Sequence, residues 1–252
     1  MCRLLGYVSA SASTLGQVLG DEQEAFLRLA AERHGDGWGI AFGQGDGVGV
    51  RKEAASAATS PAFTELAGTL RSDAALVHLR WATLDLGVSL ANTHPFGDGQ
   101  LAFAHNGSIS EMPPLETLTG ERSGPAPLGD TDSERYWLVA RSAIEREGED
   151  LRGLATAVLA IEQSCRYTSL NCMLITPARL IAVCWFGSER IAPDLGDDYY
   201  DLSYRTGREA TVVASSGWHG SGWKRVPNGA MLVVERAGGA TRVVALRDLV
   251  AA

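Results

Sequence analysis

Cysteine is the second residue of this chain, directly after Met1 and ahead of an apolar, strand-like run. Removal of Met1 would leave Cys2 with a free α-amine and a thiol on the same residue. The unperturbed pKa is about 8 for an α-amine and about 8.5 for a thiol, so the amine can act as a base near neutral pH. A nucleophile beside an N-terminal amine is one solution to activating a weak thiol. Cys2 is therefore a candidate nucleophile, although a cysteine at this position is by itself also an ordinary small residue.

Polar side chains gather in four clusters at the ends of apolar runs, where a rigid scaffold presents chemistry. In chain order these clusters are Asp36-Gly37-Trp38-Gly39, His78-Leu79-Arg80-Trp81-Ala82-Thr83, His105-Asn106-Gly107 and Gly129-Asp130-Thr131-Asp132-Ser133-Glu134. We take their charged, amide and hydroxyl side chains as the candidates for ligand binding.

Two of these clusters carry opposite charges. The Arg80 guanidinium suits a carboxylate, which it can bind through two parallel hydrogen bonds, but it could equally form a structural ion pair. Thr83 could add a hydroxyl to the same ligand or cap a turn. Asp132 starts a predicted helix, where a carboxylate either caps the helix or holds a ligand's ammonium group. A cation and an anion together would fit the zwitterionic head of an amino acid.

The pair Asn106-Gly107 follows a predicted strand and has two interpretations. The Asn amide and an unobstructed glycine N–H could form an oxyanion hole. The same dipeptide is also the strongest signal of a type I′ hairpin turn. His94, followed by Pro95-Phe96, invites a general-base role, but we favour an ordering role for it.

Composition excludes several classes of function. The formal net charge is −8 and the pI is near 5.2, which argues against a general nucleic-acid binder or a protein of anionic membranes. No apolar stretch is long enough to span a bilayer, and the N-terminus lacks a secretory signal, so we expect a cytoplasmic location. The scattered histidines and the absence of a C-x-x-C pair predict neither a metal site nor a cofactor.

The apolar patterns predict which elements position these clusters. Strands are expected at Cys2–Val8, Ile40–Phe42, Ala74–Trp81, Leu101–His105, Leu170–Thr176, Arg179–Phe186, Glu209–Ala214, Ala230–Glu235 and Thr241–Ala245. Helices are expected at Asp21–Glu32, Pro61–Leu70, Asp132–Glu145 and Leu151–Glu162, with turns between His105 and Thr131. This order lacks regular β-α-β alternation, and it favours an α+β fold of two mainly antiparallel sheets between helices. No repeat or low-complexity linker divides residues 1–252, which predicts a single domain.

Taken together, these residues resemble the class II glutamine amidotransferases, a branch of the N-terminal-nucleophile hydrolases. Six segments match in the right order over the first 134 residues: Cys2-Arg3-Leu4-Leu5-Gly6, Asp36-Gly37-Trp38-Gly39, His78-Leu79-Arg80-Trp81-Ala82-Thr83, Asn92-Thr93-His94-Pro95-Phe96, Ala104-His105-Asn106-Gly107 and Thr131-Asp132-Ser133-Glu134. The resemblance implies a four-layer αββα sandwich, which the β-rich last third would complete.

The resemblance also implies a role for each residue. Cys2 would attack the γ-amide carbonyl of a glutamine-like substrate, its own α-amine would act as the base, and water would resolve the γ-glutamyl thioester. The oxyanion hole would comprise Asn106 and the backbone N–H of Gly107. The substrate α-carboxylate would be held by Arg80 and Thr83, and the α-ammonium by Asp132.

Three hypotheses about the substrate and the role of this chain stay open. The chain leaves no room for the synthase to which large family members are fused, so it would be a free-standing glutaminase or would pass ammonia to a synthase partner. It would alternatively hydrolyse a larger γ-glutamyl amide, since it is similar in size and layout to the ergothioneine-pathway hydrolase of γ-glutamyl-hercynylcysteine sulfoxide. Trp38, Trp81 and the loop Trp218–Trp223 could then form an aromatic wall for the leaving group, although core packing explains these tryptophans equally well. In the third hypothesis the chain is a catalytically silent regulatory subunit.

Overall fold

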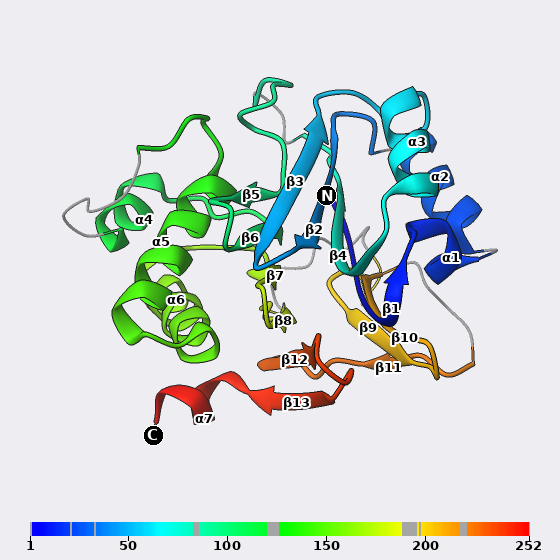
Figure 1. Ribbon diagram of the computed structural model, residues 1–252. Helices are drawn as coiled ribbons and strands as arrows, with labels where there is room; N and C mark the ends of the chain where they lie inside the picture. The colour runs from blue at the N-terminus through cyan, green and yellow to red at the C-terminus, as the bar shows by residue number, and fades with distance from the viewer. Residues whose placement is uncertain are drawn as a thin grey trace.

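The computed structural model describes residues 2–20, 22–32, 34–82, 86–119, 126–187, 196, 198–216 and 221–251. Within these ranges the chain forms two antiparallel sheets that pack face to face, and helices cover the outer face of each sheet (Figure 1).

The first sheet carries the N-terminal strand at its centre. In spatial order its strands are β11 (Lys224–Arg225), β9 (Leu202–Thr206), β10 (Ala210–Ser215), β1 (Arg3–Ser13), β4 (Ser72–Leu79), β2 (Trp38–Gln44) and β3 (Gly47–Glu53). Every neighbouring pair is antiparallel, and β1 lies between β10 and β4. The residue before β1, Cys2, is therefore held at one end of a central strand.

The second sheet supplies the opposite wall. In spatial order its strands are β13 (Thr241–Ala245), β12 (Ala230–Glu235), β8 (Arg179–Cys184), β7 (Asn171–Ile175), β6 (Ala102–Asn106) and β5 (Phe96–Gly97). These pairs are antiparallel too.

The helices separate into two groups. The first sheet is covered by α1 (Leu15–Leu19), α2 (Glu22–Glu32) and α3 (Pro61–Thr69), and the second by α4 (Met112–Leu118), α5 (Asp132–Glu147), α6 (Asp150–Ser164) and α7 (Leu246–Val250). Figure 1 shows α1–α3 on one side of the strands and α4–α6 on the other. The predicted αββα sandwich is thus confirmed.

Side-chain alternation along β1 explains how one strand serves two cores. Leu4 and Val8 are buried between the sheets, whereas Leu5 and Tyr7 are buried under the helices of the first sheet. Gly6 faces the opposite sheet, where a Cβ would come within 2.8 Å of a Leu180 methyl group. The glycine therefore lets the two sheets approach closely.

Most predicted elements are present with ends moved by a few residues, but the segment between His105 and Thr131 differs. It contains α4, whose first turn holds Pro113 and Pro114. Proline is compatible with the first turn of a helix because the N–H groups there have no intrahelical partner. In this segment, which we expected to consist of turns, Pro113 and Pro114 thus lie at the start of a helix. No helix in the described part of the chain combines the length and apolarity that crossing a bilayer requires.

Candidate active site

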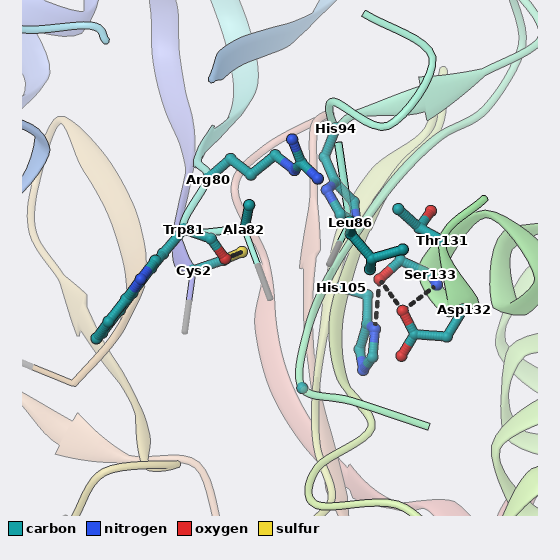
Figure 2. A pocket seen from close by; sticks show the side chains of 11 residues that line it. Cys2, Arg80, Trp81, Ala82, Leu86, His94, His105, Thr131, Asp132 and Ser133 are labelled. Atoms are coloured by element: carbon teal, nitrogen blue, oxygen red, sulfur yellow. Dashed lines mark hydrogen bonds between the residues drawn. The ribbon is translucent and has the colours of Figure 1, made fainter. Parts of the chain in front are cut away.

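Segments that are far apart in the sequence meet in one pocket between the two sheets. It is bounded by Cys2, Arg80, Trp81, Ala82, Leu86, His94, His105, Gly107, Thr131, Asp132 and Ser133, and its space of about 390 Å³ includes some that is open to solvent. Figure 2 shows Cys2, Trp81 and Ala82 on one side and Thr131, Asp132 and Ser133 on the other, with the Arg80 side chain reaching between them. The candidate nucleophile, cation and anion therefore share one space.

Cys2 lies directly before β1 and is half-buried. Its Sγ lies 3.7 Å from the backbone oxygen of Trp81. Burial raises the pKa of the Cys2 thiol; the Arg80 guanidinium lowers this pKa, and the Asp132 carboxylate raises it. A thiol with a raised pKa needs a base before it can attack a carbonyl carbon.

Arg80 follows β4 and is 3% exposed. Both of its Nη atoms donate to the carbonyl oxygen of Gly87, at 3.3 and 3.2 Å. Burial lowers the pKa of Arg80, while Cys2 and Asp36 raise it. Asp36 also accepts a hydrogen bond from the Ala82 N–H at 2.8 Å, so the Asp36-Gly37-Trp38-Gly39 cluster fixes the segment that follows β4.

Asp132 is the first residue of α5, but it is not the helix cap. The N-cap is Thr131, whose hydroxyl accepts from the Glu134 N–H. The Asp132 carboxylate instead accepts from the Ile109 N–H at 2.6 Å and from the Ser133 N–H at 2.8 Å. These bonds fix the carboxylate at the positive end of a helix and at the pocket wall.

Asn106 and Gly107 do not form the two-residue hairpin turn that was the alternative interpretation. Asn106 is the last residue of β6, whose sheet partners are β5 and β7. Its side chain is 1% exposed, and Oδ1 has no hydrogen-bond partner among the described residues. Gly107 lines the pocket, and a Cβ there would collide with the Ser169 backbone oxygen, so only glycine fits.

Two buried histidines, His94 and His105, line the pocket, and a third, His78, packs against His94. The rings of His78 and His94 lie 4.2 Å apart, and both nitrogens of His94 lack partners among the described residues. Burial lowers the pKa of each well below its usual value. His105 bonds the Ser133 hydroxyl through Nδ1 and donates from Nε2 to the Ser169 oxygen, both at 2.9 Å. His94 is thus neutral near pH 7 and has nitrogens to offer a ligand.

These histidines predict a loss of stability in mild acid. Burial lowers the pKa of His78, His94 and His105, so the unfolded chain takes up protons below about pH 6.5 that the folded chain refuses. The free energy of unfolding should therefore fall as pH falls from 7 to 5. Burial raises the pKa of Asp150 to about 6 and also raises the pKa of Asp201, so these two carboxyl groups oppose the trend of the three histidines. Urea midpoints measured across this range, with His94→Gln expected to flatten the slope, test the prediction. A flat profile would contradict it.

The remaining predicted residues have different fates. The structure does not bring Trp38 to the pocket: its side chain is 2% exposed under the helices of the first sheet, and its Nε1 donates to Glu53. Trp81 lines the pocket instead and is 39% exposed. Thr83 and Trp218 lie outside the described residues. Trp223 packs against the core of the first sheet.

Some pocket residues were not singled out by the sequence. Leu86 lies in a loop with no motif around it, and Ser133 had no predicted role of its own. Across the described ranges, no three His, Cys, Asp or Glu side chains are grouped to hold a metal ion. That the site works without a metal or cofactor stays a prediction.

Comparison with known proteins gives consistent matches. Residues 1–249 match the family model of the class II glutamine amidotransferases. The chain is 28% identical over 248 residues to the gamma-glutamyl-hercynylcysteine sulfoxide hydrolase of Mycobacterium tuberculosis, covering 94% of each chain. Its fold is similar to a glutamine aminotransferase class-II domain protein of Silicibacter pomeroyi (TM-score 0.67, 21% identity, 97% of this chain and 100% of that one). It is also similar to the glutamine phosphoribosylpyrophosphate amidotransferase of B. subtilis (TM-score 0.63, 18% identity, 97% of this chain and 49% of that one).

Proposed function

Because this chain belongs to the class II glutamine amidotransferases and is thus an amide-cleaving enzyme, we propose that it hydrolyses γ-glutamyl amides through a thioester on Cys2. One observation carries the proposal. The Cys2 thiol, the Arg80 guanidinium and the Asp132 carboxylate line the same pocket. A γ-glutamyl substrate requires a nucleophile at its amide end, and a cation and an anion at its α-amino acid end.

Activation of the thiol is the first chemical requirement. Burial raises the pKa of Cys2, so the attacking sulfur has to lose a proton to a base. Removal of Met1 supplies that base as the α-amine of Cys2 itself. Sγ then bonds the γ-carbonyl carbon, the C–N bond breaks, and the base returns its proton to the leaving nitrogen. Water hydrolyses the thioester, which releases glutamate and restores the thiol.

The negative charge that develops on the carbonyl oxygen needs hydrogen-bond donors. We assign this role to the Asn106 side-chain amide and the Gly107 N–H. The position of Asn106 at the end of β6 and of Gly107 at the pocket wall supports the assignment, since donors that are preorganised at a site stabilise an oxyanion strongly.

The amino-acid head of the substrate is assigned to the other pocket residues. Among the described residues, the hydrogen bonds of Arg80 go to the Gly87 oxygen, and the remaining N–H donors of the guanidinium suit the α-carboxylate. Asp132 suits the α-ammonium. The uncharged imidazole of His94 suits a hydrogen bond to the substrate. Thr83 remains assigned to the α-carboxylate from its motif alone.

The leaving group distinguishes two substrates that share this head. Glutamine would release ammonia, to water or to a synthase partner. A larger γ-glutamyl conjugate would release an amine, and two observations favour it. Trp81, 39% exposed at the pocket wall, offers an aromatic face for a bulky group. The relative from M. tuberculosis, which is matched over nearly its whole length, is named a hydrolase of such a conjugate.

Glutamate release measured from glutamine and from γ-glutamyl conjugates tests the proposal. We expect the processed protein to release glutamate and to prefer a conjugate, with an intact mass that lacks Met1. Absence of glutamate release from every γ-glutamyl amide would refute the enzymatic proposal and favour a silent regulatory subunit. Full activity with Met1 retained would refute the α-amine as the base.

A further inference from the structure

Asn92 joins the two charged sides of the pocket, although it is not among the residues that line it. Its side chain is 2% exposed. Nδ2 donates to the Gly87 carbonyl oxygen at 3.1 Å, and Oδ1 accepts from the Asp130 N–H at 2.9 Å. Both hydrogen-bonding ends of one buried amide are thus used to tie two backbone segments together.

The first of these segments orients Arg80. The Gly87 oxygen that Asn92 contacts is the same oxygen that accepts from both Nη atoms of Arg80, at 3.3 and 3.2 Å. A guanidinium is planar, so a partner on one edge also fixes where its remaining N–H groups point. The direction in which Arg80 offers its free donors therefore depends on where Asn92 holds Gly87.

The second segment carries Asp132. Asp130 lies two residues before it, and the adjoining Leu128 and Gly129 N–H groups are held by the Glu134 carboxylate at 2.8 and 2.7 Å. Packing at this junction is tight, since a Cβ on Gly129 would collide with Oδ1 of Asn92. The segment before α5, residues 128–130, is thereby held both by Glu134 of that helix and by Asn92.

We infer that Asn92 is a positioning residue that sets the span between Arg80 and Asp132, and that it thereby makes the site selective for ligands bearing both an α-carboxylate and an α-ammonium. A zwitterionic head needs its cation and anion partners at a fixed separation, and small misplacements of binding groups weaken recognition steeply. The inference rests on the proposed function, in which Arg80 and Asp132 hold that head.

The test compares γ-glutamyl-p-nitroanilide with glutaryl-p-nitroanilide, which lacks the α-amino group. Two variants disturb the junction, by which we mean the contacts of the Asn92 side chain with Gly87 and Asp130. Asn92→Leu removes both hydrogen bonds, and Gly129→Ala displaces Asn92 while keeping every polar group. Each variant should raise KM for the γ-glutamyl substrate about 10-fold or more and leave kcat within a few-fold of wild type. Each should therefore reduce the preference of the enzyme for the γ-glutamyl substrate over the glutaryl substrate. If one variant fails to fold, the other carries the test.

The control is Asn228→Asp. Asn228 also bridges backbone through both ends of its amide, since it accepts from the Phe186 N–H and donates to the Phe186 oxygen at 3.0 and 2.7 Å. It does not line the pocket. This variant should keep the wild-type preference. Junction variants that lose kcat on both substrates alike, with the preference unchanged, would reduce Asn92 to a structural role and overturn the inference.

A binding measurement separates this inference from the proposed function. L-glutamate and glutarate are titrated into Cys2→Ala protein, with and without Asn92→Leu. If glutamate binds more tightly than glutarate, and Asn92→Leu removes that difference, the inference holds even where wild-type protein cleaves no amide. Wild-type turnover with a preference that does not depend on Asn92 overturns the inference alone. Equal binding of both ligands by Cys2→Ala protein also overturns it.

Discussion

Replacing Cys2 by alanine is expected to lower glutamate release by at least about 10⁴-fold, because no other group then forms the thioester. The change removes a single half-buried thiol whose contact is with the Trp81 backbone oxygen at 3.7 Å, so the protein should still fold. A glutamine-mimicking diazoketone should label wild-type protein once, on Cys2, and should not label the variant. Steady-state rates and the mass of the labelled peptide measure both effects.

The matched control for this prediction is Cys165→Ala. Cys165 is a buried thiol at the C-cap of α6, away from the pocket, and its loss should leave the rate of glutamate release unchanged. Label found on Cys165, or substantial turnover by Cys2→Ala protein, would show that the nucleophile lies elsewhere.

Replacing Asn106 by alanine is expected to lower kcat by about 10²–10³-fold with little change in KM, which is the usual cost of one oxyanion-hole donor. We expect no loss of thermal stability. Oδ1 of Asn106 is buried and has no partner among the residues that the structure describes, so the substitution removes a polar group that these residues do not satisfy. Rates and thermal unfolding curves, measured on the same preparation, check the two halves of the prediction.

Asn171 provides the contrast, because it lies directly across from Asn106 in the β6–β7 register. Its amide is bonded at both ends, with Nδ2 donating to the Tyr200 oxygen and Oδ1 accepting from the Trp185 N–H. Asn171→Ala should therefore reduce the free energy of unfolding by about 1–3 kcal/mol. An Asn106→Ala protein that keeps kcat within about twofold, or that is destabilised as strongly as Asn171→Ala, would refute the oxyanion assignment.

A raised thiol pKa fits a nucleophile with its own built-in base. Burial of Cys2 suppresses a free thiolate, which would otherwise react with any electrophile in solution. The neutral histidines next to the pocket add no positive charge there that would stabilise a thiolate. The site is thus arranged to generate the nucleophile at the moment of proton transfer.

The sequence alone determined which segments form the strands and helices of the layers, because a buried face requires apolar residues at the period of a strand or of a helix. Alternation in β1 and helical spacing in α3, α5 and α6 are local properties, so they predict strands and helices without knowledge of their neighbours. Proline was harder to interpret, since Pro113 and Pro114 can either end a helix or begin one.

Only the tertiary structure decided which candidates meet. Trp38 and Trp81 are equally aromatic in the sequence, but Trp38 is buried under the helices of the first sheet, whereas Trp81 is one of the residues that line the pocket. Asn106 and Asn92 are both buried. Among the described residues the Asn106 side-chain oxygen has no hydrogen-bond partner, whereas the Asn92 amide bridges two segments, and this difference depends on residues distant in the chain. Residue type limits what a side chain can do, whereas long-range packing fixes its direction and its hydrogen-bond partners.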